Sequence, residues 1–432
     1  MNGIAIPKSK NTYKIAIEEL PMPKIAVIPL IQHIGSPSKP VVKTGDIVKT
    51  GQLIAELTDV ISARIHSPVS GKVLEIEKRI HPYGCGVESI VIESDEQDDT
   101  VKFNSKDPNK LFPNEIVDII KNAGIVGLGG ACFPTHIKLC SPREKKIDSV
   151  ILNGCECEPY LTCDYRVILE ETEKVIGGLM LMMKIHNANN GCLVIGNIKK
   201  SVLKKLKDEV QNTGIPVKGI NIISLKSKYP QGAERQLVET VFRKKIPYGK
   251  LPYDVGCIVH NVQTAKAVYE AVYIGKPLFE RIITVAGSIK DTGNYKVRIG
   301  TPISEIINYC GGLVGDVKKI ILGGPMMGIS QYSLDVPVTK GTLGIVALND
   351  KESKIYETTD CIRCGRCVSK CPEGLVPMVI SQYVENEKYF ELADYNPLAC
   401  KECGICEYEC PAKIHLVQKL RIAKQKMSTL KY

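Results

Sequence analysis

Two cysteine runs near the C-terminus constrain this chain more than any other feature. Each run has the pattern C-x-x-C-x-x-C-x-x-x-C-P, which is the spacing of two-cluster ferredoxins. In this spacing three thiolates bind one [4Fe–4S] cluster, and the cysteine before the proline binds the other cluster. We therefore expect one cluster on Cys361, Cys364, Cys367 and Cys410, and a second cluster on Cys400, Cys403, Cys406 and Cys371.

Zinc and disulfides fit these runs less well than iron does. Zinc ribbons use paired C-x-x-C motifs rather than triple runs that end in Cys-Pro, and thiolate sulfur also suits iron. Two adjacent clusters indicate a protein that moves single electrons. Eight of the 17 cysteines belong to the runs, and the others lack the spacing of secreted proteins. A cluster-binding chain of this kind belongs in a reducing compartment, so we expect the cytoplasm.

The 432-residue chain is long enough for roughly three domains. Its first residues lack the apolar core of a signal peptide. The longest apolar run, Val175–Met183, is far shorter than the ~20 residues of a membrane helix. The net charge of +10 is spread along the chain rather than gathered in a patch, apart from the tail Lys419–Lys431, which disfavours a nucleic-acid partner. An acidic partner, a dinucleotide phosphate or an anionic membrane surface fits this charge better.

Short β-prone runs separated by turns fill residues 25–95. Ser67–Gly71 resembles the second half of a biotinyl or lipoyl hammerhead, which is a barrel-sandwich hybrid of strands. In that family a lysine after an aspartate carries the cofactor, but here Asp59 is followed by Val60. Because no amine is available for the amide bond, we expect a structural or docking module that is not lipoylated.

A glycine-rich loop follows a helix that we predict from Pro113. The loop runs from Gly127 to Lys138 and reads GLGGACFPTHIK. Glycines let the backbone approach a ligand closely, and free N–H groups can hold a phosphate. Lys138 can reach a phosphate as a point charge. The loop alone is weak evidence, because ordinary turns are also rich in glycine.

An acidic, cysteine-containing loop follows the predicted buried strand Val150–Leu152. Glu156 and Glu158 lie in this loop and could bind ribose hydroxyls, or could favour the dipole of the following helix. Cys155, Cys157 and Cys163 look like a metal trio without an obvious fourth ligand, so thiols without a metal are the favoured interpretation. The roles of these three cysteines, and of Cys85 and Cys132, stay open.

Strand and helix patterns alternate from about Gly191 to Asn261, which predicts an α/β domain with parallel strands. Ligands of such domains bind beyond the carboxyl ends of the strands. The predicted ends carry Tyr229, Gln231, Gly232, Glu234, Asn261 and Thr264. From Arg281 to about Asn349 the pattern becomes β-rich around a helix at Ile303–Tyr309, which suggests an α+β grasp module. A final helix is expected at Ile414–Lys426.

The order of these motifs resembles the C subunit of the Rnf ion-translocating electron-transport complex over nearly the full length. GLGGACFPTHIKL, NGCECEPYLTCDYR, YPQGAERQL and HNVQTA precede the cysteine runs, and the middle of the chain is also similar to the flavin-carrying subunit of respiratory complex I. The resemblance implies a multidomain α/β and α+β protein. Its expected domains are a barrel-sandwich hybrid at 1–100, an FMN- and NADH-binding α/β domain at 108–280, a soluble-ligand-binding β-grasp domain at 281–350, and a helical ferredoxin-like domain with two [4Fe–4S] clusters at 355–432.

The resemblance also implies roles for individual residues. Gly127, Gly129, Gly130, Phe133 and Lys138 would lie against FMN and the nicotinamide dinucleotide. Asn153 would contact the flavin, Glu156 and Glu234 would belong to the nucleotide pocket, and Asn261 and Thr264 would hold the FMN side chain or phosphate. No catalytic side chain is expected, because the hard chemistry belongs to the cofactor.

The expected function is electron transfer between NADH, through FMN, and the two clusters, in the peripheral NADH-side subunit of an ion-translocating complex. Its partners would be other complex subunits on the cytoplasmic face of the membrane. Two departures leave alternatives open: Cys155 replaces the aspartate of complex I, and Asn2–Pro7 replaces the usual Gly-Gly-Ile/Val-His-Pro opening. The alternatives are a soluble donor to proline reductase or cobalamin reductase, an electron wire with a degenerate flavin site, and a scaffold.

Overall fold

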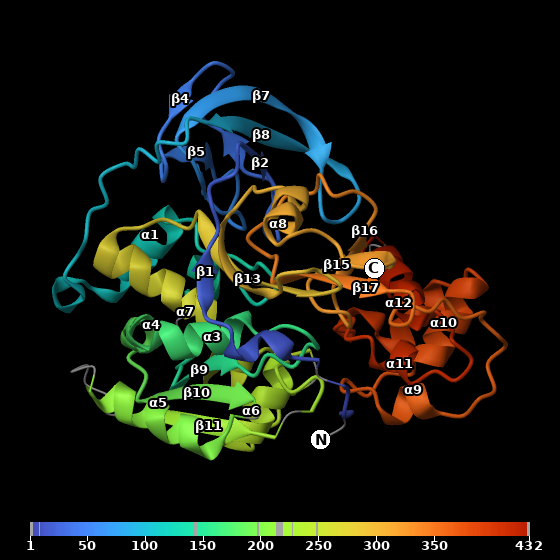
Figure 1. The fold of residues 1–432 in the computed structure, drawn as a ribbon. Coiled ribbons are helices and arrows are strands. Elements are labelled where there is room, and N and C mark those ends of the chain that lie inside the picture. The colour runs from blue at the N-terminus through green and yellow to red at the C-terminus, as the bar shows by residue number, and fades with distance from the viewer. Residues whose placement is uncertain are drawn as a thin grey trace.

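A computed structural model describes residues 3–7, 9–140, 145–196, 198–212, 219–226, 228–247 and 249–429. The outer ends of the first and last predicted domains, residues 1–2 and 430–432, lie outside the described residues, and so does Lys431 of the basic tail. Figure 1 shows a β-barrel at the top, a parallel sheet with its helices at the lower left, a mixed sheet between them, and a helical unit at the right. These are called below the barrel, parallel-sheet, mixed-sheet and cluster domains.

The barrel domain consists of two antiparallel sheets that share one core. One sheet has the strand order β2-β8-β7-β4 and the other has the order β3-β5-β6. The strands are β2 (Ile25–Pro29), β3 (Lys39–Pro40), β4 (Ile47–Val48), β5 (Leu53–Glu56), β6 (Ile65–His66), β7 (Gly71–Ile80) and β8 (Gly86–Ser94). Fully buried Ile28, Ile54 and Ile90 fill the core. Val60, at the position of the hammerhead lysine, lies on the turn between β5 and β6 and is 74 % exposed.

The parallel-sheet domain has four parallel strands in the order β11-β10-β9-β12. They are β9 (Ser149–Gly154), β10 (Asn190–Gly196), β11 (Ile220–Leu225) and β12 (Cys257–Asn261). The helices are α1 (Pro113–Asn122), α2 (Thr135–Leu139), α3 (Cys163–Glu170), α4 (Thr172–His186), α5 (Lys200–Asn212), α6 (Glu234–Phe242) and α7 (Val262–Tyr269). From β9 the chain adds β10 and β11 on one side of the sheet, and it then returns to place β12 on the other side of β9. Open α/β sheets bind ligands at such a topological switch point.

The apolar run of the sequence is part of helix α4, which packs inside the protein against α7. An ideal Cβ at Gly178 of α4 would lie 1.9 Å from the carbonyl oxygen of Ala265, so the two helices can approach this closely only through glycine. Among the described residues, no helix has both the length and the apolar character needed to cross a bilayer.

The mixed-sheet domain has six strands in the order β1-β14-β13-β17-β15-β16. Its elements are β13 (Glu280–Gly287), β14 (Gly293–Arg298), α8 (Ile303–Tyr309), β15 (Val317–Leu322), β16 (Ile329–Gln331) and β17 (Gly344–Asn349). The edge strand β1 (Ile17–Glu19) comes from the N-terminal segment and pairs in parallel with β14. Residues before the barrel therefore belong to a sheet whose other strands lie far later in the chain.

The cluster domain is built from short helices around the cysteines. The helices are α9 (Arg366–Ser369), α10 (Pro377–Glu385), α11 (Ile405–Tyr408) and α12 (Leu416–Thr429). Leu392, Leu420 and Ala423 are almost completely buried between them. The remaining helical turns are 3₁₀ segments at Asn11–Lys14, Pro108–Lys110, Pro252–Val255, Phe390–Tyr395 and Pro397–Ala399, and a π turn at Glu270–Ile274.

A buried lysine joins three of the domains. The Lys340 side chain is 1 % exposed. Its Nζ donates to the carbonyl oxygens of Arg64 in the barrel domain, at 2.7 Å, and of Gly124 in the parallel-sheet domain, at 2.8 Å. Its backbone N–H donates to Oε1 of Gln32 in the barrel domain at 3.0 Å. Burial lowers the pKa of this ammonium group to about 7.

Three histidines near this junction make the fold sensitive to acid. Burial, with the nearby charge of Lys340, lowers the pKa of His33 to about 4 and that of His66 to about 3, and burial also lowers the pKa of His136 to about 4. Each ring is therefore neutral in the folded protein at pH 6, whereas an unfolded histidine titrates near pH 6.5. The unfolded chain binds more protons in this range, so stability falls as the pH drops below about 6.5.

We predict that these histidines lower the apparent Tm between pH 7 and pH 5, while the buried carboxyls of Glu158 and Asp164, whose pKa values are raised, oppose the loss over the same range. Each of the three histidines can contribute up to about 1.4 kcal/mol per pH unit to the loss. By calorimetry, the double variant His33→Gln/His66→Gln should therefore lose less Tm over this range than the original protein, or gain Tm. A pH dependence of Tm that is the same in the double variant and in the original protein would contradict this account.

Candidate functional site

The candidate site lies at the carboxyl ends of β9 and β12. Asn261 is the last residue of β12, Asn153 is the next-to-last residue of β9, and the two are direct partners in the sheet register. The Asn153 side chain donates from Nδ2 to the carbonyl oxygen of Gly232 at 2.8 Å, and its Oδ1 accepts from the N–H of Cys155 at 3.1 Å. The loop before α6 is thereby held against the end of β9.

The glycine-rich loop covers the first turn of α7. The N–H of Leu128 donates to Oγ1 of Thr264 at 2.8 Å, and the N–H of Gly127 donates to the carbonyl oxygen of Phe133 at 2.9 Å. An ideal Cβ at Gly129 would lie 3.2 Å from the Cβ of Asn261, and Gly130 has a φ of +100°. Both glycines are exposed, so the loop presents backbone to a ligand as a phosphate cradle requires. This geometry fits a flavin phosphate held at the start of a helix.

Lys138 and Glu234 form an ion pair across the site, with 2.5 Å between Nζ and Oε1. Lys138 lies on α2 at the end of the glycine-rich loop, and Glu234 is the first residue of α6. Their side chains are 27 % and 43 % exposed, so both charges remain accessible to a ligand. The structure thus brings together two residues whose positions near the dinucleotide were predicted from two separate motifs.

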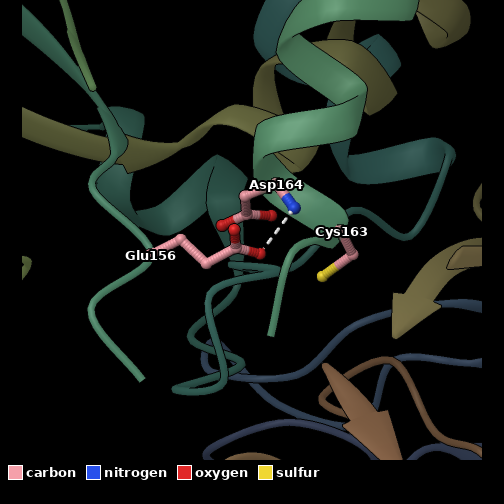
Figure 2. A group of neighbouring side chains, drawn as sticks. All are labelled: Glu156, Cys163 and Asp164. Atoms are coloured by element: carbon pink, nitrogen blue, oxygen red, sulfur yellow. Dashed lines mark hydrogen bonds between the residues drawn. The ribbon is translucent and has the colours of Figure 1, made fainter. Parts of the chain in front are cut away.

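The acidic loop after β9 turns Glu156 back onto helix α3. Glu156 has a φ of 38°, and its Oε1 accepts from the N–H of Asp164 at 2.8 Å (Figure 2). The Asp164 carboxylate accepts from Nδ2 of Asn261 at 2.6 Å and from Nε2 of Gln263 at 2.9 Å. Burial and the charge of Glu156 raise the pKa of Asp164. Asp164 therefore fixes the Asn261 side chain, a role that the sequence did not indicate.

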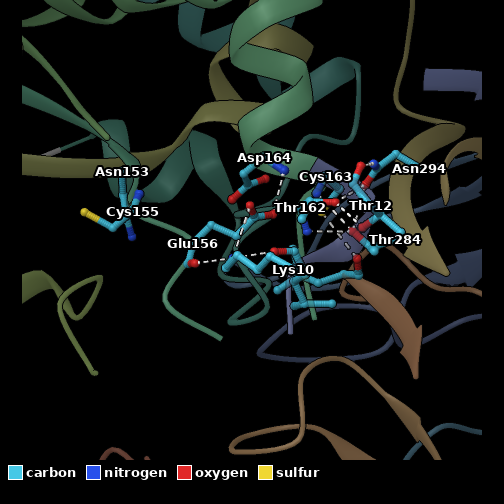
Figure 3. Close-up of polar contacts among 12 residues, drawn as sticks. Lys10, Thr12, Asn153, Cys155, Glu156, Thr162, Cys163, Asp164, Thr284 and Asn294 are labelled. Atoms are coloured by element: carbon cyan, nitrogen blue, oxygen red, sulfur yellow. Dashed lines mark hydrogen bonds and ion pairs between the residues drawn. The ribbon is translucent and has the colours of Figure 1, made fainter. Parts of the chain in front are cut away.

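Lys10 supplies a positive charge to this acidic loop from the N-terminal segment (Figure 3). Its Nζ donates to the carbonyl oxygens of Glu156, at 2.7 Å, and of Leu161, and lies 3.6 Å from Oε2 of Glu156. Sequence reasoning missed Lys10 because a single lysine in a short polar segment has no motif. Only the contact, over a separation of 146 residues, shows its position.

A chain of hydroxyl and amide groups anchors the same loop to the mixed-sheet domain (Figure 3). Thr12 and Thr162 share a hydrogen bond of 2.6 Å between their Oγ1 atoms. The Thr162 hydroxyl also donates to Oδ1 of Asn294 at 2.9 Å, and its N–H donates to Oγ1 of Thr284 at 2.9 Å. These buried contacts place the loop between the N-terminal segment and strands β13 and β14.

The suspected cysteine trio does not converge on one point among the described residues. Cys163 lies beside Glu156 and Asp164, with the potential ligand atoms of the three residues within 4.8 Å of one another, whereas Cys155 and Cys157 are not part of this group. Hydrogen bonds already occupy the two carboxylates, and Sγ of Cys163 donates to the carbonyl oxygen of Leu343 at 3.4 Å. Burial raises the pKa of Cys163, which favours a neutral thiol.

The eight cysteines of the two runs line two cavities. The first cavity has a volume of about 400 Å³ and is lined by Cys361, Cys364, Cys367 and Cys410. The second is lined by Cys371, Cys400, Cys403 and Cys406. Each cavity thus combines three cysteines of one run with the last cysteine of the other, as the spacing predicts. Four thiols around one cavity fit an iron–sulfur cluster.

The second cavity adjoins the parallel-sheet domain. Tyr229, which is 1 % exposed, donates its hydroxyl hydrogen to the carbonyl oxygen of Cys403 at 2.7 Å. Ile405 packs with Tyr229 and Ile4 in one buried cluster. From α6, Gln236 donates to the carbonyl oxygen of Pro372 at 3.4 Å. The flavin candidate site and the second cluster cavity are therefore connected through α6 and the loop before it.

Glu158 belongs to this connection rather than to the nucleotide site. Its Oε2 accepts from the N–H of Met326 at 3.0 Å, and its Oε1 lies 3.5 Å from the Tyr229 hydroxyl. Burial raises the pKa of Glu158 to about 7. The two acidic residues of the loop thus diverge: Glu156 contacts helix α3 and Lys10, whereas Glu158 contacts Met326 and Tyr229.

Four family models match consecutive parts of the chain. They are the RnfC barrel sandwich hybrid domain at residues 1–97, the Nuo51 FMN-binding domain at 120–270, the SLBB domain at 282–330 and the 4Fe-4S dicluster domain at 360–414. These matches follow the order of the four domains in the structure. They confirm the predicted fold class, with FMN and [4Fe–4S] clusters as cofactors.

Relatives match along nearly the whole chain. The C subunit of the proton-translocating ferredoxin:NAD(+) oxidoreductase complex of Clostridium ljungdahlii is 44 % identical over 96 % of this chain and 91 % of its own length. The C subunit of the Na(+)-translocating ferredoxin:NAD(+) oxidoreductase complex of Acetobacterium woodii is 41 % identical over 98 % of this chain and 96 % of its own length. The C subunit of the ion-translocating oxidoreductase complex of Rhodobacter capsulatus is 39 % identical over 96 % of this chain and 80 % of its own length.

A solved structure shares the fold at low sequence identity. An NAD+-reducing [NiFe]-hydrogenase in the H2-reduced state aligns with a TM-score of 0.53 and 18 % identity. The alignment covers 74 % of this chain and 64 % of the hydrogenase chain, which is less than two thirds of its length. This likeness supports the fold alone.

A charge swap separates two roles of Lys138. Lys138→Glu places a second carboxylate beside Glu234, and we expect it to lower FMN affinity by roughly 10- to 100-fold, or about 1.4–2.8 kcal/mol. The swapped variant Lys138→Glu/Glu234→Lys restores the ion pair but not the position of the positive charge. If Lys138 contacts an anionic ligand, FMN affinity stays low in the swap; recovery to the original affinity would limit Lys138 to holding Glu234. For both variants, FMN released by acid gives the flavin occupancy, and iron content gives the cluster occupancy.

Crossed ligation predicts which cluster each cysteine serves. Cys371→Ser should damage the cluster of Cys400, Cys403 and Cys406, because Cys371 lines their cavity. Cys410→Ser should damage the cluster of the first run, because Cys410 lines the cavity of Cys361, Cys364 and Cys367. EPR of the reduced variants distinguishes the two clusters if their signals differ in relaxation or g values. Loss of the nearest cluster in sequence by each variant would contradict the crossed arrangement.

Proposed function

Because the chain belongs to the family of C subunits of Rnf-type ion-translocating oxidoreductase complexes, we propose that it transfers electrons between NADH and two [4Fe–4S] clusters by way of FMN. It would act as the NADH-side subunit of such a complex. The observation that carries the proposal is the connection between the flavin candidate site and a cluster cavity through α6 and the loop before it. Asn153 holds this loop at Gly232, and Tyr229 and Gln236 donate to carbonyl oxygens of Cys403 and Pro372.

The residues at the carboxyl ends of β9 and β12 have complementary roles in this proposal. FMN, when bound, supplies the chemistry that connects a two-electron hydride donor to one-electron carriers. The exposed backbone of Gly129 and Gly130 would bind the flavin phosphate at the start of α7, where Thr264 holds the loop. Asn153 would contact the flavin, and Asn261 would hold its side chain while Asp164 orients the amide.

The dinucleotide would enter from the side of the ion pair. Lys138 and Glu234 are the accessible charges there, and Glu234 would accept from ribose hydroxyls while Lys138 would neutralise the phosphate of FMN or of the dinucleotide. Phe133, which is half-buried at the end of the glycine-rich turn, would cover an aromatic ring. Glu156 would line the nucleotide pocket, and the positive charge of Lys10 would offset the negative charge of its carboxylate.

The partners in this proposal are the other subunits of a membrane complex. The names of the relatives from Clostridium ljungdahlii and Acetobacterium woodii describe such complexes. We place the chain on the cytoplasmic side, held at the membrane by those subunits. Purification from membranes with and without mild detergent tests this, because a soluble donor to another reductase would separate from membrane proteins in both conditions.

The decisive test is anaerobic addition of NADH to the reconstituted protein. We predict that the visible flavin absorbance bleaches and that both clusters then become EPR-active, with no partner present. Protein that retains flavin but does not bleach would instead be an electron wire. Protein that retains neither flavin nor clusters after reconstitution would be a scaffold. NADPH serves as the matched comparison for the dinucleotide site.

A further inference from the structure

The two cysteine runs have the same local fold but different surroundings. Arg363 and Glu402 occupy equivalent positions, with φ values of 54° and 55°, and each is followed two residues later by a left-handed glycine. The glycines, Gly365 and Gly404, begin the equivalent short helices α9 and α11. The cluster domain therefore carries two copies of one loop, and their neighbours can be compared directly.

The loop of the second run is covered by the rest of the chain. An ideal Cβ at Gly404 would lie 2.8 Å from the carbonyl oxygen of Met326. Ile405, the next residue, is fully buried and packs against Ile4 and Tyr229. This copy of the loop is the one through which the cluster domain contacts the flavin candidate site.

The loop of the first run is open. An ideal Cβ at Gly365 would meet no atom within 4 Å. Arg366 stands where the second run has Ile405, and it is exposed. Cys364 is also exposed, and the neighbouring Ile362 side chain is 67 % exposed. A cluster in the first cavity would thus lie next to a surface that the described residues leave uncovered.

The open loop is basic where the covered loop is acidic or apolar. Arg363, Arg366 and Lys370 are exposed, and none of them has an ion pair within the part of the chain that the structure describes. Their equivalents in the second run are Glu402, Ile405 and Glu409. Glu402 is neutralised by Arg421 at 2.7 Å and Lys424 at 2.5 Å. Two described acidic residues line the first cavity beside this loop: Asp360, which precedes Cys361, and Glu385, which pairs with Lys419 at 3.6 Å.

We propose that this face, defined by Ile362, Arg363, Cys364, Arg366 and Lys370, is the docking surface for an acidic one-electron carrier protein. The proposal rests on the proposed function and names the partner of its outer cluster. One electron would pass between the redox centre of the carrier and the cluster held by Cys361, Cys364, Cys367 and Cys410. One partner loses the electron that the other gains, and no bond is formed or broken and no proton moves. Complementary charge steers such encounters, and Ile362 supplies an apolar contact beside the cysteine.

The test uses the full-length reconstituted protein and a soluble acidic [2Fe–2S] ferredoxin as the probe. NADH first reduces the flavin and both clusters without any acceptor, which examines the proposed function separately. In a separate experiment the oxidised protein is mixed, in a stopped-flow instrument, with ferredoxin that dithionite has already reduced, because plant-type ferredoxins have low potentials of about −400 mV. Arg363→Glu/Arg366→Glu should lower the second-order rate constant at least tenfold at low ionic strength, and the loss should shrink to less than threefold at about 0.5 M salt, where surface charges are screened.

Two exposed lysines on α5 provide the matched control. Lys204→Glu/Lys205→Glu makes the same change in net charge on a helix far from the cluster domain (Figure 1). This control should stay within twofold of the original rate. An equal loss in both variants, or no loss in the first at low salt, would overturn the proposal.

A second measurement uses the unaltered protein, so it remains informative even if the variant Arg363→Glu/Arg366→Glu fails to hold its cluster. With the unaltered protein, the rate with ferredoxin should fall as salt is added, and the rate with the basic carrier cytochrome c should rise. Flat or opposite slopes would overturn the proposal. Binding to phosphatidylglycerol vesicles that depends on Arg363 and Arg366, with an unchanged ferredoxin rate, would assign the face to an anionic membrane instead.

Discussion

The arrangement of the barrel, parallel-sheet and mixed-sheet domains depends on the buried ammonium group of Lys340. It donates to carbonyl oxygens of the first two domains from a loop of the third, in surroundings that disfavour its charge. A buried polar group is costly unless it is hydrogen-bonded, so any separation of these domains must also rehydrate this group. The glycine-rich loop begins three residues after Gly124, and its position follows from this junction.

The candidate site is assembled from elements that are distant in the sequence. β9 and β12 provide the two asparagines, the glycine-rich loop provides backbone, and the N-terminal segment provides Lys10. The cluster domain then meets the opposite side of the loop before α6 through Tyr229. A parallel sheet suits this task, because its carboxyl ends collect loops at one edge. Function therefore depends on how the domains are docked as much as on any one of them.

The sequence predicted those parts of the protein whose signal is local. The cysteine spacing predicted which residues line each cavity, and the helix Ile303–Tyr309 was predicted at the residues where it occurs. The parallel strands between Gly191 and Asn261 were predicted from their alternation with helix patterns. The pairing of β1 with β14, the salt bridge of Lys10 and the orientation of Asn261 by Asp164 were not predictable, because they depend on contacts between distant segments.

The N-terminal segment has a consequence for how the chain is made. Ile4 pairs with Tyr229, Ile17 with Asn294, and Ile4 also packs against Ile405. During synthesis this segment leaves the ribosome long before any of these partners exists. Contacts of such high sequence separation form late, since the intervening chain must be closed first. The pairing with β14 therefore cannot form before residue 294 has been translated, and the packing of Ile4 against Ile405 cannot form before the second cysteine run has been translated.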